Sequence, residues 1–60
     1  MKLSKGQILE LEITSLAYGG MGISHYDDII IFVKGAIPGE KVKAKIYKKI
    51  ENELKSLKLS

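Results

Sequence analysis

The residues best suited to chemistry are lysines that recur at every second position of one segment: Lys41, Lys43 and Lys45. Alternate residues of a β-strand point to the same face and lie about 7 Å apart. That spacing is close to the separation of successive phosphates in an extended single strand of nucleic acid. Tyr47 continues the row, and an aromatic ring among lysines can stack on a base while the lysines contact the backbone.

Further lysines and aromatic residues are candidates for the same interface. All 10 basic residues of the chain are lysines, so the bidentate base recognition that arginine provides is missing and backbone contact is favoured. The additional candidates for phosphate contact are Lys34, Lys48 and Lys49, and those for stacking are Tyr18 and Phe32. Lysines on an outer strand can also serve only to prevent edge-to-edge aggregation. The net charge of +3 suits both interpretations, so the residues alone leave both open.

Catalysis has little support in the sequence. His25 is the only histidine, and there is no cysteine. Asp27 and Asp28 are adjacent and indicate a solvated turn, whereas Glu10 and Glu12 share a strand face that is ordinarily a solvated stripe. There is no phosphate-binding glycine loop followed by Lys-Ser/Thr, and no spacing of ligands favours a metal. The sequence predicts no catalytic residue, no metal site and no cofactor bound by this chain.

Alternating hydrophobicity predicts the strands that would position these side chains. Residues 6–13 and 40–50 place apolar side chains on one face and mostly charged ones on the other, as half-buried strands do. Residues 22–26 form a shorter predicted strand. The run 28–33 is almost continuously apolar, so alternation does not decide which of its side chains point inward. The pair Lys48-Lys49 breaks the alternation and indicates a bulge or the end of a strand.

Clustered glycines predict the turns between these strands. Glycine adopts positive φ without steric cost, and Pro38-Gly39 fits the two central positions of a type II turn. Strands and turns together predict a small all-β meander. The predicted turn residues are Gly19, Gly20, Gly22, Gly35, Pro38 and Gly39.

The C-terminal tail fits two structures. Ile50, Leu54 and Leu57 recur with helical spacing, whereas Leu57 and Leu59 alternate as residues of a strand do. A strand here would protect an edge of the barrel, which favours the strand.

Length and composition indicate one domain, residues 1–60, with a thin core. The absence of cysteine suits a reducing compartment. No apolar stretch approaches the roughly 20 residues of a membrane span, and the start of the chain lacks the apolar core of a signal peptide. We therefore expect a cytoplasmic protein without membrane contact. The pattern at its end predicts that it is the N-terminal part of a larger enzyme.

Two motifs resemble the TRAM domain, a small RNA-binding β-barrel of RNA methyltransferases and methylthiotransferases. They are YGGMGI at residues 18–23 and FVKGAIPGEKV at residues 32–42, and the likeness extends over residues 6–50. The combination is similar to the version at the N-terminus of RNA uracil-5-methyltransferases. Lys34, where the family commonly has proline, and the acidic pair Asp27-Asp28 depart from the pattern.

The resemblance implies a five-stranded antiparallel barrel, similar in shape to the oligonucleotide-binding (OB) fold, which presents tRNA or rRNA to a catalytic domain. In such enzymes S-adenosylmethionine donates the methyl group, a cysteine of the catalytic domain attacks uracil, and some members carry an iron–sulfur cluster. The chain has no cysteine, so that chemistry would belong to the catalytic domain of the same parent chain. RNA and that catalytic domain are the implied partners.

A protein-interaction barrel is the alternative function. The segment Ile29–Phe32 is apolar enough to dock on a neighbouring domain, and the lysines would then serve solubility. Titration with a short RNA separates the two functions, because only the RNA-binding module would respond.

Overall fold

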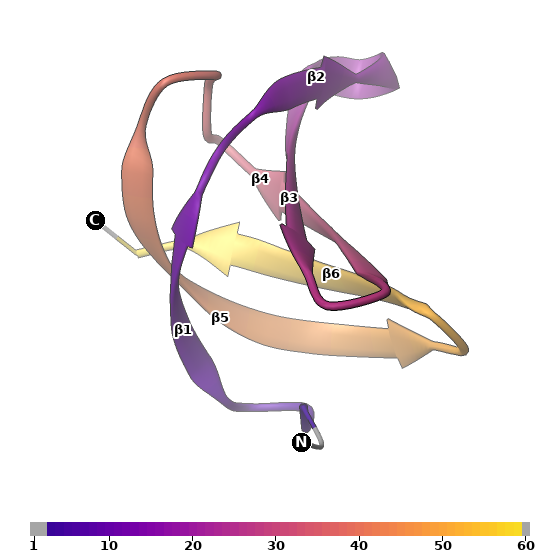
Figure 1. Cartoon of the computed structure of the whole chain (residues 1–60). Helices are drawn as coiled ribbons and strands as arrows, with labels where there is room; N and C mark the ends of the chain where they lie inside the picture. Colours follow the sequence, from indigo (N-terminus) through magenta and orange to yellow (C-terminus); the bar gives the residue numbers. More distant parts are fainter. Residues whose placement is uncertain (1–2, 60) are drawn as a thin grey trace.

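The computed structural model describes residues 3–59, which form six β-strands and one short 3₁₀ segment (Figure 1). The predicted all-β barrel class is confirmed, but the predicted count of five strands is wrong. The additional strand comprises residues 15–17, which pair with residues 21–23. The strands are β1 (Ile8–Glu12), β2 (Ser15–Ala17), β3 (Met21–Tyr26), β4 (Ile29–Lys34), β5 (Lys41–Ile50) and β6 (Glu53–Lys58), and the 3₁₀ segment η1 is Tyr18–Gly20.

A single sheet contains all six strands in the order β1-β5-β6-β4-β3-β2. Its pairings are antiparallel except that of β4 with β6, which is parallel. The prediction of an entirely antiparallel barrel is therefore wrong. The tail does form a strand, β6, but that strand lies between β4 and β5 rather than at an edge of the sheet.

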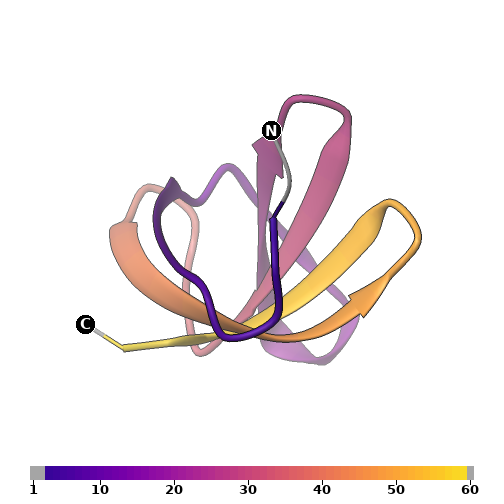
Figure 2. The same ribbon diagram turned by 90° about the horizontal axis from the view of Figure 1, so that it is seen from below.

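The sheet curls into a half-barrel because its two edge strands are consecutive in the sequence (Figure 2). Ile13 and Thr14 join β1 to β2. The N–H of Ile13 donates to the carbonyl oxygen of Glu40 at 2.8 Å, and that of Thr14 donates to Ile23 at 2.9 Å. One bent segment thus bonds to both halves of the sheet.

The core lies inside this curl and takes alternate side chains from the strands. In the apolar run of β4, Ile31 and Val33 are buried, whereas Ile30 and Phe32 lie on the outer face. The structure thus shows which side chains of this run point inward, a question that alternation did not decide. The buried apolar side chains are Leu3, Leu11, Ile13, Ile31, Val33, Ala36, Val42, Ala44, Ile46 and Leu54.

One glycine has a role other than the predicted one. Gly22 lies within β3 rather than in a turn, and it is buried against the β1–β2 bend. An added Cβ would come 2.7 Å from Cγ2 of Ile13 and 3.0 Å from the carbonyl oxygen of Ala36. This glycine is needed for close packing. The other predicted turn glycines adopt positive φ: Gly19, Gly20, Gly35 and Gly39.

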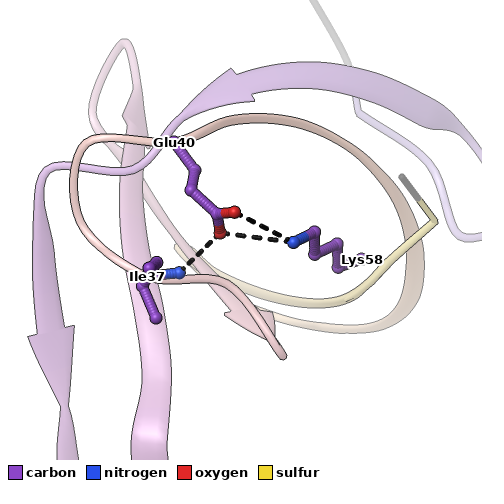
Figure 3. A network of polar contacts seen from close by, with 3 residues as sticks. All are labelled: Ile37, Glu40 and Lys58. Carbon is purple, nitrogen blue, oxygen red and sulfur yellow. Dashed lines mark hydrogen bonds and ion pairs between the residues drawn. The ribbon is translucent and has the colours of Figure 1, made fainter.

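Glu40 closes the loop between β4 and β5 (Figure 3). Its backbone N–H donates to the carbonyl oxygen of Ile37 at 3.2 Å, across the predicted Pro38-Gly39 turn. Its carboxylate accepts from the N–H of Ile37 at 2.9 Å and from Nζ of Lys58 at 3.1 Å. The bond from the Ile37 N–H and the ion pair with Lys58 lower the pKa of Glu40. The loop and the end of β6 are thus tied together.

Candidate nucleic-acid interface

The outer face of β5 carries the predicted lysine row. Lys41, Lys43 and Lys45 are exposed, and the residues between them are buried in the core. Local alternation therefore predicted the direction of these side chains correctly, because β5 is half-buried along this stretch. What the row can bind depends on the strands on either side of it.

Glutamates lie opposite the first two lysines. In the register of β1 with β5, Glu12 faces Lys41 and Glu10 faces Lys43. Residues directly opposite in an antiparallel pair have Cβ atoms about 5 Å apart, and opposite charges there attract. These four residues form a charge-balanced strip, in which each lysine lies across from a glutamate.

The third lysine has apolar neighbours instead. Lys45 faces Ile8 on β1 and Leu57 on β6, and these two side chains are 54% and 48% exposed. On the far side of Leu57, Lys34 of β4 occupies the matching position. A row across β5, β6 and β4 therefore consists of Lys45, Leu57 and Lys34.

A β-bulge brings a second row beside the first. The register of β5 with β6 shifts between Ile46 and Lys48, so Tyr47 is the extra residue. Lys48 consequently faces Lys55 of β6, and Lys55 faces Phe32 of β4. Lys55 lies between two buried residues of β6, so it points outward, and Lys48 shares its face.

These two rows form a continuous surface, which we call the basic–apolar face. The hydroxyl of the buried Ser56 donates to the carbonyl oxygen of Phe32 at 3.0 Å and ties β6 to β4 beneath it. No glutamate or aspartate faces its lysines in the register of residues 3–59. The face comprises Lys34, Lys45, Lys48 and Lys55, with Phe32 and Leu57 between them.

The sequence pattern did not identify Lys55 as part of this face. It also grouped Lys49 with Lys48, whereas the structure separates the two. Lys55 joins the face only through the parallel pairing of β4 with β6, which no local pattern signals. Lys49 faces the buried Leu54 and donates from Nζ to the carbonyl oxygen of Leu3 at 3.1 Å. The bulge thus sends two consecutive lysines to opposite faces.

The predicted aromatic residues occupy different places. Phe32 lies half-buried within the basic–apolar face, and Tyr47 is 44% exposed at the bulge. Tyr18 is fully exposed in η1, at the end of the sheet where Ala17 pairs with Met21 and Met21 pairs with Lys34. Tyr18 therefore borders the face on the side of Lys34.

The family of the chain follows from comparison with known proteins. The family model of the TRAM domain matches residues 2–57. This chain belongs to the TRAM domain family. Its backbone is also similar to the solution structure of a conserved protein of Methanococcus maripaludis, with a TM-score of 0.88 and 24% sequence identity. That likeness covers 97% of this chain and 83% of the other, and it shows the same fold.

Relatives of this TRAM domain include RNA methyltransferases. An uncharacterized RNA methyltransferase of Lactobacillus johnsonii is 48% identical over 50 residues, which are 83% of this chain and 11% of the relative. Ribosomal RNA large subunit methyltransferase E of Methanocella arvoryzae is 43% identical over 44 residues, which are 73% of this chain and 17% of the relative. The TRAM domain therefore corresponds to a small part of each relative's length.

Within residues 3–59 of the TRAM domain, His25 lies on β3, whereas Glu10 and Glu12 lie on β1. This range contains no cluster of His, Cys, Asp or Glu able to hold a metal, and it forms no pocket. His25 lies on the outer face of β3 opposite Ile30, and Glu10 and Glu12 lie opposite lysines. No helix in this part of the chain is long and apolar enough to cross a membrane.

Proposed function

We propose that this TRAM domain is an RNA-binding module of a cytoplasmic enzyme, which positions tRNA or rRNA for an S-adenosylmethionine-dependent uracil-5-methyltransferase domain of the same protein. The observation that carries the proposal is the basic–apolar face, where lysines of three strands surround two apolar side chains without facing acids. Such a surface can contact phosphates and bases together. The RNA methyltransferases among the relatives support this assignment.

The methyl-transfer chemistry would lie outside this chain. The sequence has no cysteine, so it offers neither thiolate ligands for an iron–sulfur cluster nor a cysteine nucleophile. The role of this domain would be to add contacts and local concentration of RNA to a catalytic domain.

Docking through Ile29–Phe32 has less support than RNA binding. Half of this segment is directed into the core, where Ile31 is fully buried. Of the outward residues, Phe32 is only partly exposed and lies beside Lys55. The apolar surface left for a partner domain is therefore small.

The salt dependence of RNA binding tests the proposal. If the four lysines of the face each neutralise one phosphate of a single strand, the log–log salt slope should be about −3. A fourfold rise in salt would then weaken binding about fifty-fold. Fluorescence anisotropy with a labelled RNA oligonucleotide measures both quantities.

A matched pair of variants localises the interaction. The double variant Lys45→Gln/Lys55→Gln should bring the slope to about −1.4, because two phosphate contacts are lost. The control Lys41→Gln/Lys43→Gln removes the same charge from the charge-balanced strip and should change the slope little. Absence of RNA binding by the wild-type chain at low salt would refute the proposed function.

A further inference from the structure

The basic–apolar face combines lysines with exposed apolar side chains, and an RNA duplex offers no apolar surface to cover the latter. Leu57 is 48% exposed between Lys45 and Lys34, and Phe32 lies beside Lys55. An RNA duplex presents phosphates and sugar hydroxyls, while its bases are stacked inside. Phosphates pressed against leucine and phenylalanine would lose water without gaining a partner. Unpaired bases have apolar faces that can cover such side chains.

Acidic residues border this face on one side, along β1. Ile8 of β1 lies beside Lys45 of the face, and Glu10 and Glu12 follow on the same side of β1, opposite Lys43 and Lys41. A polyanion that leaves the face along β5 toward residues 41–43 therefore meets carboxylates opposite the lysines. Repulsion of this kind disfavours that path.

A second acidic border lies at the turns. Asp27 and Asp28 occupy the β3–β4 turn, and Glu51 and Glu53 lie in or next to the β5–β6 turn. The two turns are neighbours, because the N–H of Ile30 donates to the carbonyl oxygen of Asn52 at 3.1 Å. Figure 1 shows both turns at the right-hand side of the molecule. These turns hold four of the seven acidic residues of the chain.

The remaining path across the sheet leads to Tyr18. From Lys45 the row continues through Leu57, Lys34 and Met21 to the end of β2. Tyr18 follows there, and its side chain is fully exposed. The ring is thus open to a planar ligand at the end of a row of lysines.

We propose that this TRAM domain binds an unpaired RNA segment, which crosses β5, β6 and β4 from Lys45 to Lys34 and stacks a base on Tyr18. The inference rests on the proposed function and specifies its ligand. Phosphates of the segment contact the four lysines, and bases cover Leu57 and Phe32. Stacking on the Tyr18 ring then fixes the end of the segment at η1.

The experiment compares one RNA sequence in two forms. A ten-nucleotide RNA labelled with 2-aminopurine is titrated as a single strand and after annealing to its complement. We expect the single strand to bind at least ten-fold more tightly than the duplex. We also expect the fluorescence of 2-aminopurine at one position to be quenched, because stacking on tyrosine quenches it.

Variants of Tyr18 test the stacking role separately. Tyr18→Ala should weaken binding of the single strand about ten-fold and abolish the quenching at that position. Tyr18→Phe should retain both, since the ring is kept. Leu16→Ala is the control, because Leu16 is also exposed but faces Gly22, a residue buried on the inner face of β3.

The possible failures are distinguishable. If neither form of the RNA binds at low salt, both the proposed function and this inference fall. If the duplex binds as tightly as the single strand, or if Tyr18→Ala binds like the wild type, RNA binding stands and this inference is overturned.

Discussion

The two halves of β5, taken as residues 41–44 and 45–50, each carry two lysines on the outer face, yet they differ in what lies opposite. Lys41 and Lys43 face the glutamates of β1, whereas Lys48 faces Lys55 of β6. The first half is a charge-balanced strip, and the second belongs to the basic–apolar face. Cross-strand register, rather than the number of lysines, therefore decides where this domain presents positive charge to a polyanion.

The bulge at Tyr47 produces this difference. Without it, strict alternation would place Lys48 on the inner face with Ile46. One extra residue turns Lys48 outward to Lys55 and sends Lys49 toward Leu3. Because of the bulge, Lys48 belongs to the candidate site, whereas Lys49 makes a hydrogen bond within the fold.

The largest expected effect is that of charge reversal on the basic–apolar face. Lys48→Glu/Lys55→Glu should weaken RNA binding at least about fifty-fold at low salt, since two phosphate contacts are lost and two repulsive charges are gained. The loss of RNA affinity in Lys41→Glu/Lys43→Glu should be several-fold smaller. Anisotropy titrations of both variants measure the difference, and equal losses would show that only net charge matters.

Removing the glutamates of β1 provides a second test of the difference between the two halves of β5. Glu10→Gln/Glu12→Gln frees Lys41 and Lys43 from their facing carboxylates. Affinity for RNA should rise about five-fold at low salt, and the salt slope should steepen by about one. Unchanged affinity and slope would mean that these glutamates do not restrain the lysines opposite them.

Two adjacent lysines should give opposite results. Lys49→Met removes the bond from Nζ to the Leu3 carbonyl oxygen, so we expect a loss of about 1 kcal/mol in the free energy of unfolding and little change in RNA affinity. Lys48→Met should weaken RNA binding about five-fold and leave the melting temperature unchanged. Thermal unfolding and RNA titration of both variants decide whether the bulge divides their roles.

The smallest effect concerns acid pH and the ion pair of Lys58. The folded state lowers the pKa of Glu40, so its contribution to stability is present above the pKa of the unfolded state. That contribution is lost as the pH falls through the lowered pKa of the folded state. Glu40→Gln should therefore reduce the melting temperature slightly at pH 7. On acidification, the melting temperature of this variant should fall less than that of the wild type.

The same pair supplies a check on RNA binding. Because Lys58 is engaged by Glu40, Lys58→Met should leave RNA affinity nearly unchanged. A loss as large as that of Lys48→Met would extend the interface beyond the basic–apolar face.

Local patterns were sufficient for part of this account. Alternation in residues 6–13 and 40–50 predicted β1, β5 and the direction of Lys41, Lys43 and Lys45. The break at Lys48-Lys49 predicted either a bulge or the end of a strand, and the register shows the bulge. Such features depend on neighbours in the sequence, and side-chain period reports them directly.

Long-range pairing was beyond local patterns. Nothing near Lys55 indicates that β6 inserts between β5 and β4, so its position beside Phe32 was missed. The pairing of Glu10 with Lys43 depends on register between strands far apart in the sequence. Clustered glycines predict a turn at Gly22, whereas the close approach of Ile13 and Ala36 explains this glycine.

The most direct test of the central claim is a ¹H–¹⁵N NMR titration of the chain with a short RNA. Backbone shifts should concentrate in β4, β6 and the second half of β5, around Phe32, Leu57 and Lys48. Residues of β1 and the first half of β5, including Glu10 and Lys43, should change little. Shifts centred on β1 and residues 41–43, with β4 and β6 unaffected, would contradict the account.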